Sequence, residues 1–492
     1  YKDALYYCVF WTGKKMSVPI TVAYGDGIGP EIMEAVLLIL KEAQADIAVE
    51  TAEIGHAQYK RDWPCGIAPS SWASIRRTKV LLKSPTMTPQ GGGHKSLNVA
   101  LRKSLGLYAN VRPCVTYSPI IDTGSTNLDI VVVRENEEDT YCGVEYRISH
   151  DASVCDKITT RSASERLCAY AFRYARSHNR KRVTCLIKDN IMKMTDGTFR
   201  SAFQKVAAMY PDISSEYCIV DIGMARIAAH PEEYDVVVTP NLYGDILSDV
   251  VAVASGSIGL SGSANLGDEY AMFEAVHGSA PDIAGRNIAN PSGLLNAAVQ
   301  MLVHIGQEST AQAIHNAFLK TLEDGVHTAD IYNAKTSSSR ASTTEFAQAV
   351  VNNLGTSPKY LRSMLINKNT EEAVHYERVQ DTSKKVLVGA DVTIHWSGGD
   401  GLNELVQSLA AALSPSVKLR LIHAKGLELW PNAPCVCSYI DLLTCRFFYD
   451  AQEGVDSTSI SQLLLCLEGL GLDVVKLVKL YTFDGAEGFF TP

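Results

Sequence analysis

The chain has 492 residues, of which 46% are hydrophobic and 20% charged, as is usual for a soluble globular protein. At roughly 150 residues per domain, this length predicts about three domains. The formal net charge of −9 argues against nucleic acid as the main partner. The longest apolar runs, such as residues 463–467, are far too short for a membrane span, so we expect no membrane partner.

The 12 cysteines are scattered, and only Cys435 and Cys437 lie close together. A C-x-C pair alone is not a zinc spacing, so we expect free thiols in a reducing compartment. Residues 1–15 have some basic and aromatic character but no clear transit-peptide pattern. The sequence therefore leaves a mitochondrial and a cytoplasmic location both open.

The first predicted unit is a strand at residues 18–24, followed by GDGIGPE at residues 25–31 and a helix with apolar residues at helical spacing. A strand, a glycine loop and a helix are typical of a dinucleotide site. However, Pro30 stands where the G-x-G-x-x-G pattern needs glycine. The pattern therefore favours a tight turn over a Rossmann phosphate loop.

Further apolar strands are predicted at residues 80–83, 130–134, 183–187 and 235–239, with helical patterns between several of them. Helices rich in alanine, leucine and valine are predicted at residues 293–305, 310–322 and 343–354. This alternation predicts an α/β architecture.

A polar stretch at residues 356–384 is typical of a linker or an extended segment. After it we predict strands at residues 385–396, 417–423, 443–449 and 473–481, with helices at 401–413 and 457–470. This β-α-β-β-α-β order predicts a separate ferredoxin-like α+β domain at residues 385–492. It carries no catalytic constellation.

Several polar side chains could bind a substrate with several carboxylates. Ser96 is placed to cap a helix on which Asn98 and Arg102 share one face, and Arg112 and Arg134 lie at a loop and a strand end. Guanidinium groups hold carboxylates by paired, charged hydrogen bonds. The alternative is a set of unrelated surface arginines.

Asp245 and Asp249 lie four residues apart after an apolar strand and Gly244, and so on one face of a predicted helix. Carboxylates so placed suit Mg²⁺ or Mn²⁺, although acids near a helix N-terminus are also favoured by the macrodipole. Lys188 directly follows a strand, where open α/β sheets keep their sites. Tyr141 and Asp221, taken alone, do not indicate a function.

Taken together and in order, these segments resemble the β-decarboxylating dehydrogenases, and isocitrate dehydrogenases in particular. The motifs are GDGIGPE, GGGxxSLNVALRK, YANVRP, VVVRENEEDTYCGVE, KDNIMKMTDGTF, NLYGDILSD and FEAVHGSAPDIAG. The resemblance runs from about residue 19 to residue 354. Residues down to FDGAEGF at 483–489 resemble the extra domain of the type II, homodimeric isocitrate dehydrogenases.

The resemblance implies a fold with a large and a small α/β domain that is not a Rossmann fold. It places the large, cofactor-side domain at residues 16–115 and 255–355. The small domain, with a clasp and the dimer interface, takes residues 116–254. A linker at 356–384 and the C-terminal domain at 385–492 complete the chain.

It also implies a role for each site residue in the oxidative decarboxylation of isocitrate. The catalytic residues are Tyr141, as the acid, and Lys188, donated by the partner subunit of a homodimer. The metal ligands for Mg²⁺ or Mn²⁺ are Asp221 (also from the partner), Asp245 and Asp249. The isocitrate-binding residues are Thr88, Ser96, Asn98, Arg102, Arg112 and Arg134. The cofactor-binding residues are Asn190, Glu274, His277, Gly278, Ser279, Ala280, Pro281, Asp282, Ile283 and Asn290.

The loop residues Asp282 and Ile283 bear on the choice between NAD and NADP. In this family, NADP-dependent enzymes usually carry Lys-Tyr at these positions, where the lysine meets the 2′-phosphate. A carboxylate instead accepts hydrogen bonds from the free ribose hydroxyls of NAD and repels a phosphate. The loop therefore predicts NAD, the alternative being an Asp282 that points to solvent and selects nothing.

Three other functions remain to be weighed. A 3-isopropylmalate or homoisocitrate dehydrogenase shares the fold, but isopropylmalate enzymes present apolar side chains where this chain has Ser96 and Asn98. A non-catalytic regulatory subunit would lack Tyr141, Lys188 or an aspartate, and all are present. The C-terminal domain could bind a regulator, although dimerisation is favoured.

Overall fold

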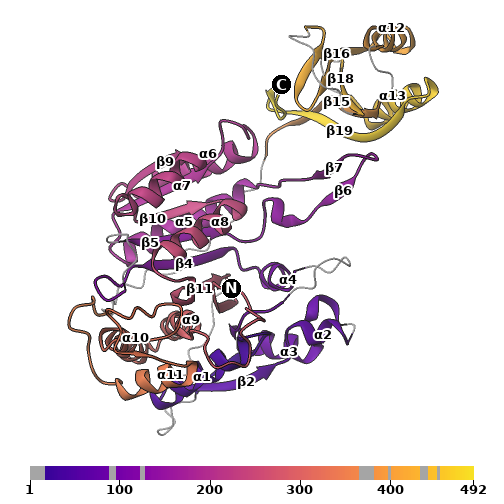
Figure 1. Cartoon of the computed structure of the whole chain (residues 1–492). Coiled ribbons are helices and arrows are strands. Elements are labelled where there is room, and N and C mark those ends of the chain that lie inside the picture. Colours follow the sequence, from indigo (N-terminus) through magenta and orange to yellow (C-terminus); the bar gives the residue numbers. More distant parts are fainter. Residues whose placement is uncertain are drawn as a thin grey trace, which may run out of the picture. The chain divides into compact units, whose positions relative to one another are not determined.

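The computed structural model describes residues 17–61, 63–87, 96–121, 128–364, 382–396, 401–432, 441–450 and 455–491 (Figure 1). The chain forms two compact units. The first contains the described residues of Tyr1–Tyr141, Thr159–Lys188 and Thr198–Val374, and the second those of Cys142–Ile158, Asp189–Gly197 and His375–Pro492. The predicted division of the α/β part into a large and a small domain stays a prediction.

The first unit is built on one mixed, ten-stranded sheet. In spatial order its strands are β2 (Ile47–Ala52), β1 (Val18–Ala23), β3 (Val80–Lys83), β12 (Ala271–Ala275), β11 (Gly262–Leu266), β4 (Ala109–Val115), β5 (Asp129–Glu135), β10 (Val236–Thr239), β8 (Arg182–Ile187) and β9 (Ser214–Ile219). Strands β4 and β11 run antiparallel to their neighbours in the middle of the sheet. The sheet is continuous through both predicted α/β domains.

Helices cover both faces of this sheet. They are α1 (Gly29–Glu42), α2 (His56–Tyr59), α3 (Pro69–Thr78), α4 (Leu97–Ser104), α5 (Arg161–Ser177), α6 (Thr195–Ala207), α7 (Val220–Ala229), α8 (Asn241–Ala254), α9 (Ser292–His304), α10 (Glu308–Glu323) and α11 (Thr343–Asn352). Two short ladders, β13 (Val326–His327) with β14 (Ser339–Arg340) and β6 (Glu145–Arg147) with β7 (Ser153–Cys155), lie outside it.

Apolar side chains decide which helix covers which part of the sheet. One core cluster joins Leu97 and Leu101 of α4 to Met272 of β12. Another joins Leu247 and Val251 of α8 to strand residues such as Val132 and Val237. Because side chains alternate across a strand, the face that holds Met272 also carries Glu274 two residues on. Helices α4 and α8 thus bring their polar residues to the same face.

The second unit contains an antiparallel six-stranded sheet with the order β17-β16-β18-β15-β19-β20. Its elements are β15 (Lys385–His395), α12 (Leu402–Ala412), β16 (Val417–Ala424), β17 (Leu427–Trp430), β18 (Leu442–Tyr449), α13 (Ser457–Gly469), β19 (Asp473–Phe483) and β20 (Ala486–Glu487). The six predicted elements are confirmed to within two residues at each end. The sequence interpretation missed β17 and β20, which are added at the two edges.

The GDGIGPE segment forms a tight turn that holds two other loops. The carboxylate of Asp26 accepts hydrogen bonds from the backbone N–H groups of His56, at 2.9 Å, and Met87, at 2.8 Å. Gly27 has φ +61°, and a Cβ there would lie 1.9 Å from the carbonyl oxygen of Ser279. The turn therefore needs glycine because the backbone of residues 276–285 packs directly against it.

Two composition-based expectations can be compared with the described residues. The cysteines in these segments are free thiols, whereas Cys435 and Cys437 lie outside them. No helix among the described residues is long and apolar enough to cross a bilayer.

Candidate active site

A pocket of about 270 Å³ brings together most of the predicted substrate residues. It lies in the first unit and is lined by side chains from strands β3, β4, β5 and β12 and helices α4 and α8. Its polar lining includes Lys83, Ser96, Asn98, Arg102, Arg112, Arg134, Tyr141, Asp245, Glu274 and His277. Residues far apart in the chain, such as Lys83 and Glu274, therefore meet in one small volume.

The three predicted arginines all reach the pocket, and all are buried. Arg134, on β5, forms an ion pair with Asp245 and donates two hydrogen bonds to Asn241 Oδ1, at 2.7 and 3.0 Å. Gly244 allows this approach, because a Cβ there would lie 2.5 Å from Arg134 Cγ. Buried guanidinium groups are costly unless they are paired, so the cluster favours an anionic ligand.

Helix α4 presents Asn98 and Arg102 on one face, as predicted. The prediction that the Ser96 side chain caps this helix is wrong. Ser96 is the residue before the helix, yet its side chain makes no capping hydrogen bond. It lines the pocket instead. Asn98 Oδ1 accepts a hydrogen bond of 3.2 Å from Thr86 Oγ1, which leaves the Asn98 amide hydrogens for a ligand. Thr88 lies outside the described residues.

Asp245 and Asp249 lie one turn apart on α8 and differ in their environment. Burial opposes ionisation of Asp245, but Arg134 and a hydrogen bond from Tyr141 outweigh it and lower the pKa of Asp245. Burial raises the pKa of Asp249, with Arg112 opposing at 3.4 Å. Burial and the bond to Asp245 raise the pKa of Tyr141, so its phenol keeps its proton at neutral pH.

The sequence interpretation missed Lys83, a fully buried cation at the C-terminal end of β3. Its ammonium lies 2.9 Å from Glu274 Oε2, and Arg102 Nη2 lies 3.0 Å from Glu274 Oε1. These two cations hold the pKa of Glu274 well below its usual value, although burial opposes them. The signal was present in the sequence, since a lysine at the end of an apolar strand also pointed to Lys188.

The predicted cofactor loop, residues 276–285, follows β12 and borders the pocket with Val276, His277 and Gly278. Burial lowers the pKa of His277, and its Nε2 atom is buried without a hydrogen-bond partner. Asn290 donates a hydrogen bond of 3.0 Å to Asp330, while Asp282 is exposed. An unpartnered buried ring nitrogen beside an open glycine loop fits a bound cofactor.

Lys188 and Asp221 form a second group in the first unit. Lys188 Nζ donates a hydrogen bond of 2.6 Å to Asp221 Oδ1, and this bond lowers the pKa of Asp221. Within the described part of the chain, no three histidine, cysteine, aspartate or glutamate residues are grouped to hold a metal. One copy of the chain therefore brings Asp245 and Asp249 together but not Asp221. Asn190 belongs to the second unit, and its role stays a prediction.

The donor set at α8 fits a hard divalent cation. Asp245 and Asp249 present carboxylate oxygens on one helix face, with side-chain exposures of 37% and 57%. Mg²⁺ and Mn²⁺ prefer oxygen ligands and keep bound water, so two carboxylates at an open edge suit them. Two carboxylates leave the remaining coordination positions to water, substrate or a further side chain.

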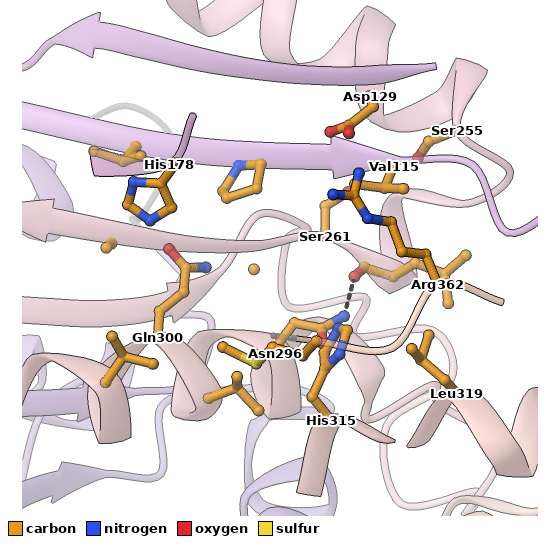
Figure 2. Close-up of a pocket in the computed structure, with 18 of the residues that line it drawn as sticks. Val115, Asp129, His178, Ser255, Ser261, Asn296, Gln300, His315, Leu319 and Arg362 are labelled. Atoms are coloured by element: carbon orange, nitrogen blue, oxygen red, sulfur yellow. Dashed lines mark hydrogen bonds between the residues drawn. The ribbon is translucent and has the colours of Figure 1, made fainter. Parts of the chain in front are cut away.

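A larger cavity, of about 1110 Å³, lies on the opposite face of the same sheet. Val111 and Pro113 of β4 line it, whereas Arg112 between them lines the small pocket, because side chains alternate along a strand. Figure 2 shows Asn296 and Gln300 of α9, His315 of α10 and Arg362 around this cavity. It contains none of the predicted site residues.

Comparisons with known proteins agree with this geometry. Residues 19–350 match the family model described as isocitrate/isopropylmalate dehydrogenase, and residues 385–492 match that of the bacterial isocitrate dehydrogenase C-terminal domain. The chain is 50% identical to isocitrate dehydrogenase [NADP] of Rickettsia bellii, over 96% of this chain and 98% of that protein.

Two further relatives cover different shares of this chain. The mitochondrial isocitrate dehydrogenase [NAD] catalytic subunit 5 of Arabidopsis thaliana is 43% identical over 69% of this chain and 89% of its own length. A crystal structure of a Thermus thermophilus protein has a TM-score of 0.89 and 37% identity, and covers 96% of this chain and 95% of its own.

Family matches over residues 19–350 and 385–492, together with an α/β sheet that carries an arginine-lined pocket, define the class of enzyme. The chain belongs to the isocitrate/isopropylmalate dehydrogenase family, as an isocitrate dehydrogenase with the bacterial-type C-terminal domain. Its reaction is the oxidative decarboxylation of isocitrate with a nicotinamide cofactor and a divalent metal.

Proposed function

We propose that this isocitrate dehydrogenase uses NAD, and the observation that carries the proposal is the carboxylate of Asp282 in the cofactor loop. Asp282 is exposed at the position where the family's NADP enzymes usually carry lysine. Asn290, another predicted cofactor residue, donates a hydrogen bond of 3.0 Å to Asp330. The carboxylate of Asp282 disfavours a 2′-phosphate and is able to accept a hydrogen bond from a ribose hydroxyl.

The names of the two relatives specify different cofactors. The long Rickettsia bellii relative is named for NADP, while the shorter Arabidopsis relative is named for NAD. Overall identity therefore does not decide the cofactor. The proposal therefore rests on the chemistry of residues 277–290, because the two cofactors differ only in the phosphate on the adenosine ribose.

We further propose a homodimer in which each active site takes Lys188 and Asp221 from the partner subunit. Ile222 on α7 and Ile246, Val250 and Val253 on α8 are exposed, by 48%, 49%, 39% and 64%. The three α8 residues recur at helical spacing and form one apolar stripe. Helices α7 and α8 pack together, so this stripe adjoins Asp221 and Asp245. A second copy seated there supplies the missing metal ligand.

The pocket residues then divide into binding and chemical roles. Arg102, Arg112 and Arg134 hold the carboxylates of isocitrate, with Ser96, Asn98 and Thr88 at the remaining polar groups. Asp245, Asp249 and Asp221 of the partner subunit would hold the divalent cation. When bound, that cation acidifies the substrate hydroxyl and stabilises negative charge on its oxygen.

Four bond changes complete the reaction. Lys188 and Asp221 of the partner subunit together accept the proton of the substrate hydroxyl. At the same time a hydride passes to the nicotinamide from the carbon that bears this hydroxyl. The carboxyl group β to the new ketone departs as CO₂. Tyr141 then donates its phenol proton to the carbon from which CO₂ departed, and its raised pKa keeps that proton in place until this step. The products are 2-oxoglutarate, CO₂ and the reduced cofactor.

Initial rates with isocitrate and Mg²⁺, measured with NAD⁺ and NADP⁺ side by side, test the proposal. We expect kcat/KM for NAD⁺ to be at least ~10-fold higher. With 3-isopropylmalate as substrate we expect no significant rate, because Ser96 and Asn98 are polar. A preference for NADP⁺ contradicts the role of Asp282. Activity with 3-isopropylmalate alone contradicts the role of Ser96 and Asn98 in binding isocitrate.

A further inference from the structure

A row of polar side chains crosses the middle of the ten-stranded sheet beneath the substrate pocket. Lys83 and Glu274 are register partners across β3 and β12, and Asn265 and Asn110 are register partners across β11 and β4. Polar residues are rare at the centre of a sheet because each must find a hydrogen-bond partner. Asn110 and Asn265 are both fully buried.

Hydrogen bonds join the members of this row into one chain between two arginines. Arg112 Nε donates to Asn110 Oδ1 at 2.7 Å, and Asn110 Nδ2 donates to Asn265 Oδ1 at 2.7 Å. Asn265 Nδ2 donates to Glu274 Oε1 at 3.0 Å, and the same oxygen accepts from Arg102 Nη2 at 3.0 Å. Asn265 thus lies midway between the guanidinium groups of Arg112 and Arg102.

The two charged ends fix the direction of every bond in the chain. Arginine only donates and an ionised carboxylate only accepts. Arg112 therefore requires the oxygen of Asn110, and Glu274 requires the amide nitrogen of Asn265. A flip of either amide would place two donors or two acceptors against each other at a buried position. Asn136 Nδ2 supports the same orientation, since it also donates to Asn265 Oδ1, at 3.1 Å.

We propose that Asn265 is a positioning residue that fixes the separation and orientation of Arg102 and Arg112 for a substrate with several carboxylates. It does not border the pocket, so it acts through Glu274 and Asn110. This inference rests on the proposed role of the two arginines in isocitrate binding. Rigid placement matters because paired charged hydrogen bonds weaken steeply with a change of angle.

The conservative substitution Asn265→Asp tests this, since an aspartic acid has the shape of asparagine. The protonated carboxyl group keeps the donation to Glu274 and accepts from Asn110, and loses only the longer donation of the amide, of 3.3 Å, to the carbonyl oxygen of Met272. The ionised group has no donor and repels Glu274, which the neighbouring cations Lys83 and Arg102 keep ionised. We expect the ratio of the variant's KM for isocitrate to that of the wild type to rise by ~10-fold or more between pH 6 and pH 8.5.

Two further measurements make the result decisive. The KM for NAD⁺ is expected to change less than ~2-fold, and Asn265→Leu is expected to raise the KM for isocitrate at every pH. Asn316→Asp, at a buried asparagine that accepts from the backbone of Met364, is the matched control and is expected to leave KM unchanged. A lower kcat or melting temperature with an unchanged, pH-independent KM would mean a purely structural role and overturn the proposal.

The arginine variants separate this inference from the proposed function. Arg102→Gln and Arg112→Gln are expected to raise the KM for isocitrate by at least ~100-fold. If they do so while Asn265→Asp and Asn265→Leu both keep the wild-type KM for isocitrate at all pH values, only the positioning role is wrong. If neither arginine variant changes the KM, the proposed binding site is wrong and the positioning role falls with it.

Discussion

Lys188 donates a hydrogen bond of 2.6 Å to Asp221, while Tyr141 is bonded to Asp245. The four residues form two pairs in one copy of the chain, and the described residues contain no three-carboxylate metal group. Both pairs are needed at one site for the reaction proposed here. The proposed active site shared by two subunits would bring both pairs together, because each subunit supplies one pair.

Mixing two inactive variants tests the shared site. Tyr141→Phe and Lys188→Met are each expected to lose at least ~100-fold in kcat, since one lacks the acid and the other the amine. In a mixed dimer, one site carries both substitutions and the other carries neither. Refolding equal amounts together should therefore restore about a quarter of wild-type activity, because half of the dimers are mixed and each has one intact site.

The control for this experiment is each variant refolded alone, which should stay inactive. A mixture that also stays inactive, although dimers form, means that both residues act within one chain. Ile246→Glu, on the exposed stripe of α8, should prevent dimers and abolish recovery, as measured by sedimentation. A monomer with full activity contradicts the shared site.

Asp282→Lys should reverse the preference between NAD⁺ and NADP⁺. The substitution removes a carboxylate that disfavours the 2′-phosphate and adds a cation that attracts it. We expect the ratio of kcat/KM for NAD⁺ to that for NADP⁺ to fall by ~100-fold or more, a difference of about 3 kcal/mol. Initial rates with both cofactors at fixed ionic strength measure the ratio.

Asp282→Asn separates the two effects, since it removes the charge without adding one. It should lower this ratio by about tenfold, because it raises kcat/KM for NADP⁺ more than it lowers kcat/KM for NAD⁺. Unchanged ratios in both variants would show that Asp282 faces solvent and that residues elsewhere select the cofactor.

Much of the fold was predictable because apolar periodicity reports local structure directly. The strand at residues 183–187 and the helix at 310–322 were found within a few residues as β8 and α10. The sequence could not give the order of strands in the sheet, since that depends on pairing between residues far apart. The short edge strand β17, Leu427–Trp430, was missed because four residues carry too little pattern.

The arginines of the candidate site were predicted from the sequence, whereas the buried asparagines behind them were not. Arg102, Arg112 and Arg134 were selected from the sequence, and they reach one pocket. Asn110 and Asn265 gave no signal, since an isolated asparagine is usually a turn residue. Only the pairing of β4 with β11 reveals that they face each other.

Asn98→Leu should weaken discrimination between isocitrate and 3-isopropylmalate. Asn98 lines the pocket, and its bond from Thr86 orients its amide hydrogens toward a ligand. A leucine cannot bind a carboxylate but accommodates an isopropyl group, so the KM for isocitrate should rise ~10- to 100-fold. Thr86→Val removes the hydrogen bond to Asn98 but keeps the Asn98 amide, so it should raise the KM for isocitrate by less. A KM within twofold of the wild type for Asn98→Leu would exclude a substrate contact.

His315, beside the large cavity in Figure 2, should make the protein less stable in mild acid. Burial lowers the pKa of His315 to about 4 from the ordinary value of 6.5, and its Nδ1 atom is buried without a partner. The folded protein therefore keeps this ring neutral, while the unfolded chain takes up a proton below pH 6.5. Proton binding to the unfolded state alone favours unfolding, so stability falls as the pH drops from 6.5 toward 4 and then levels off.

At pH 5 this single histidine should cost about 2 kcal/mol relative to pH 7.5. His315→Phe removes the titration and keeps an aromatic ring beside Phe318, whose ring centroid lies 5.9 Å away. The difference between urea midpoints at pH 7.5 and pH 5 should therefore be smaller in this variant than in the wild type. His230→Phe, where the side chain is 61% exposed, is the control and should leave that difference unchanged. An equal loss of stability in His315→Phe would mean that other groups cause the acid sensitivity.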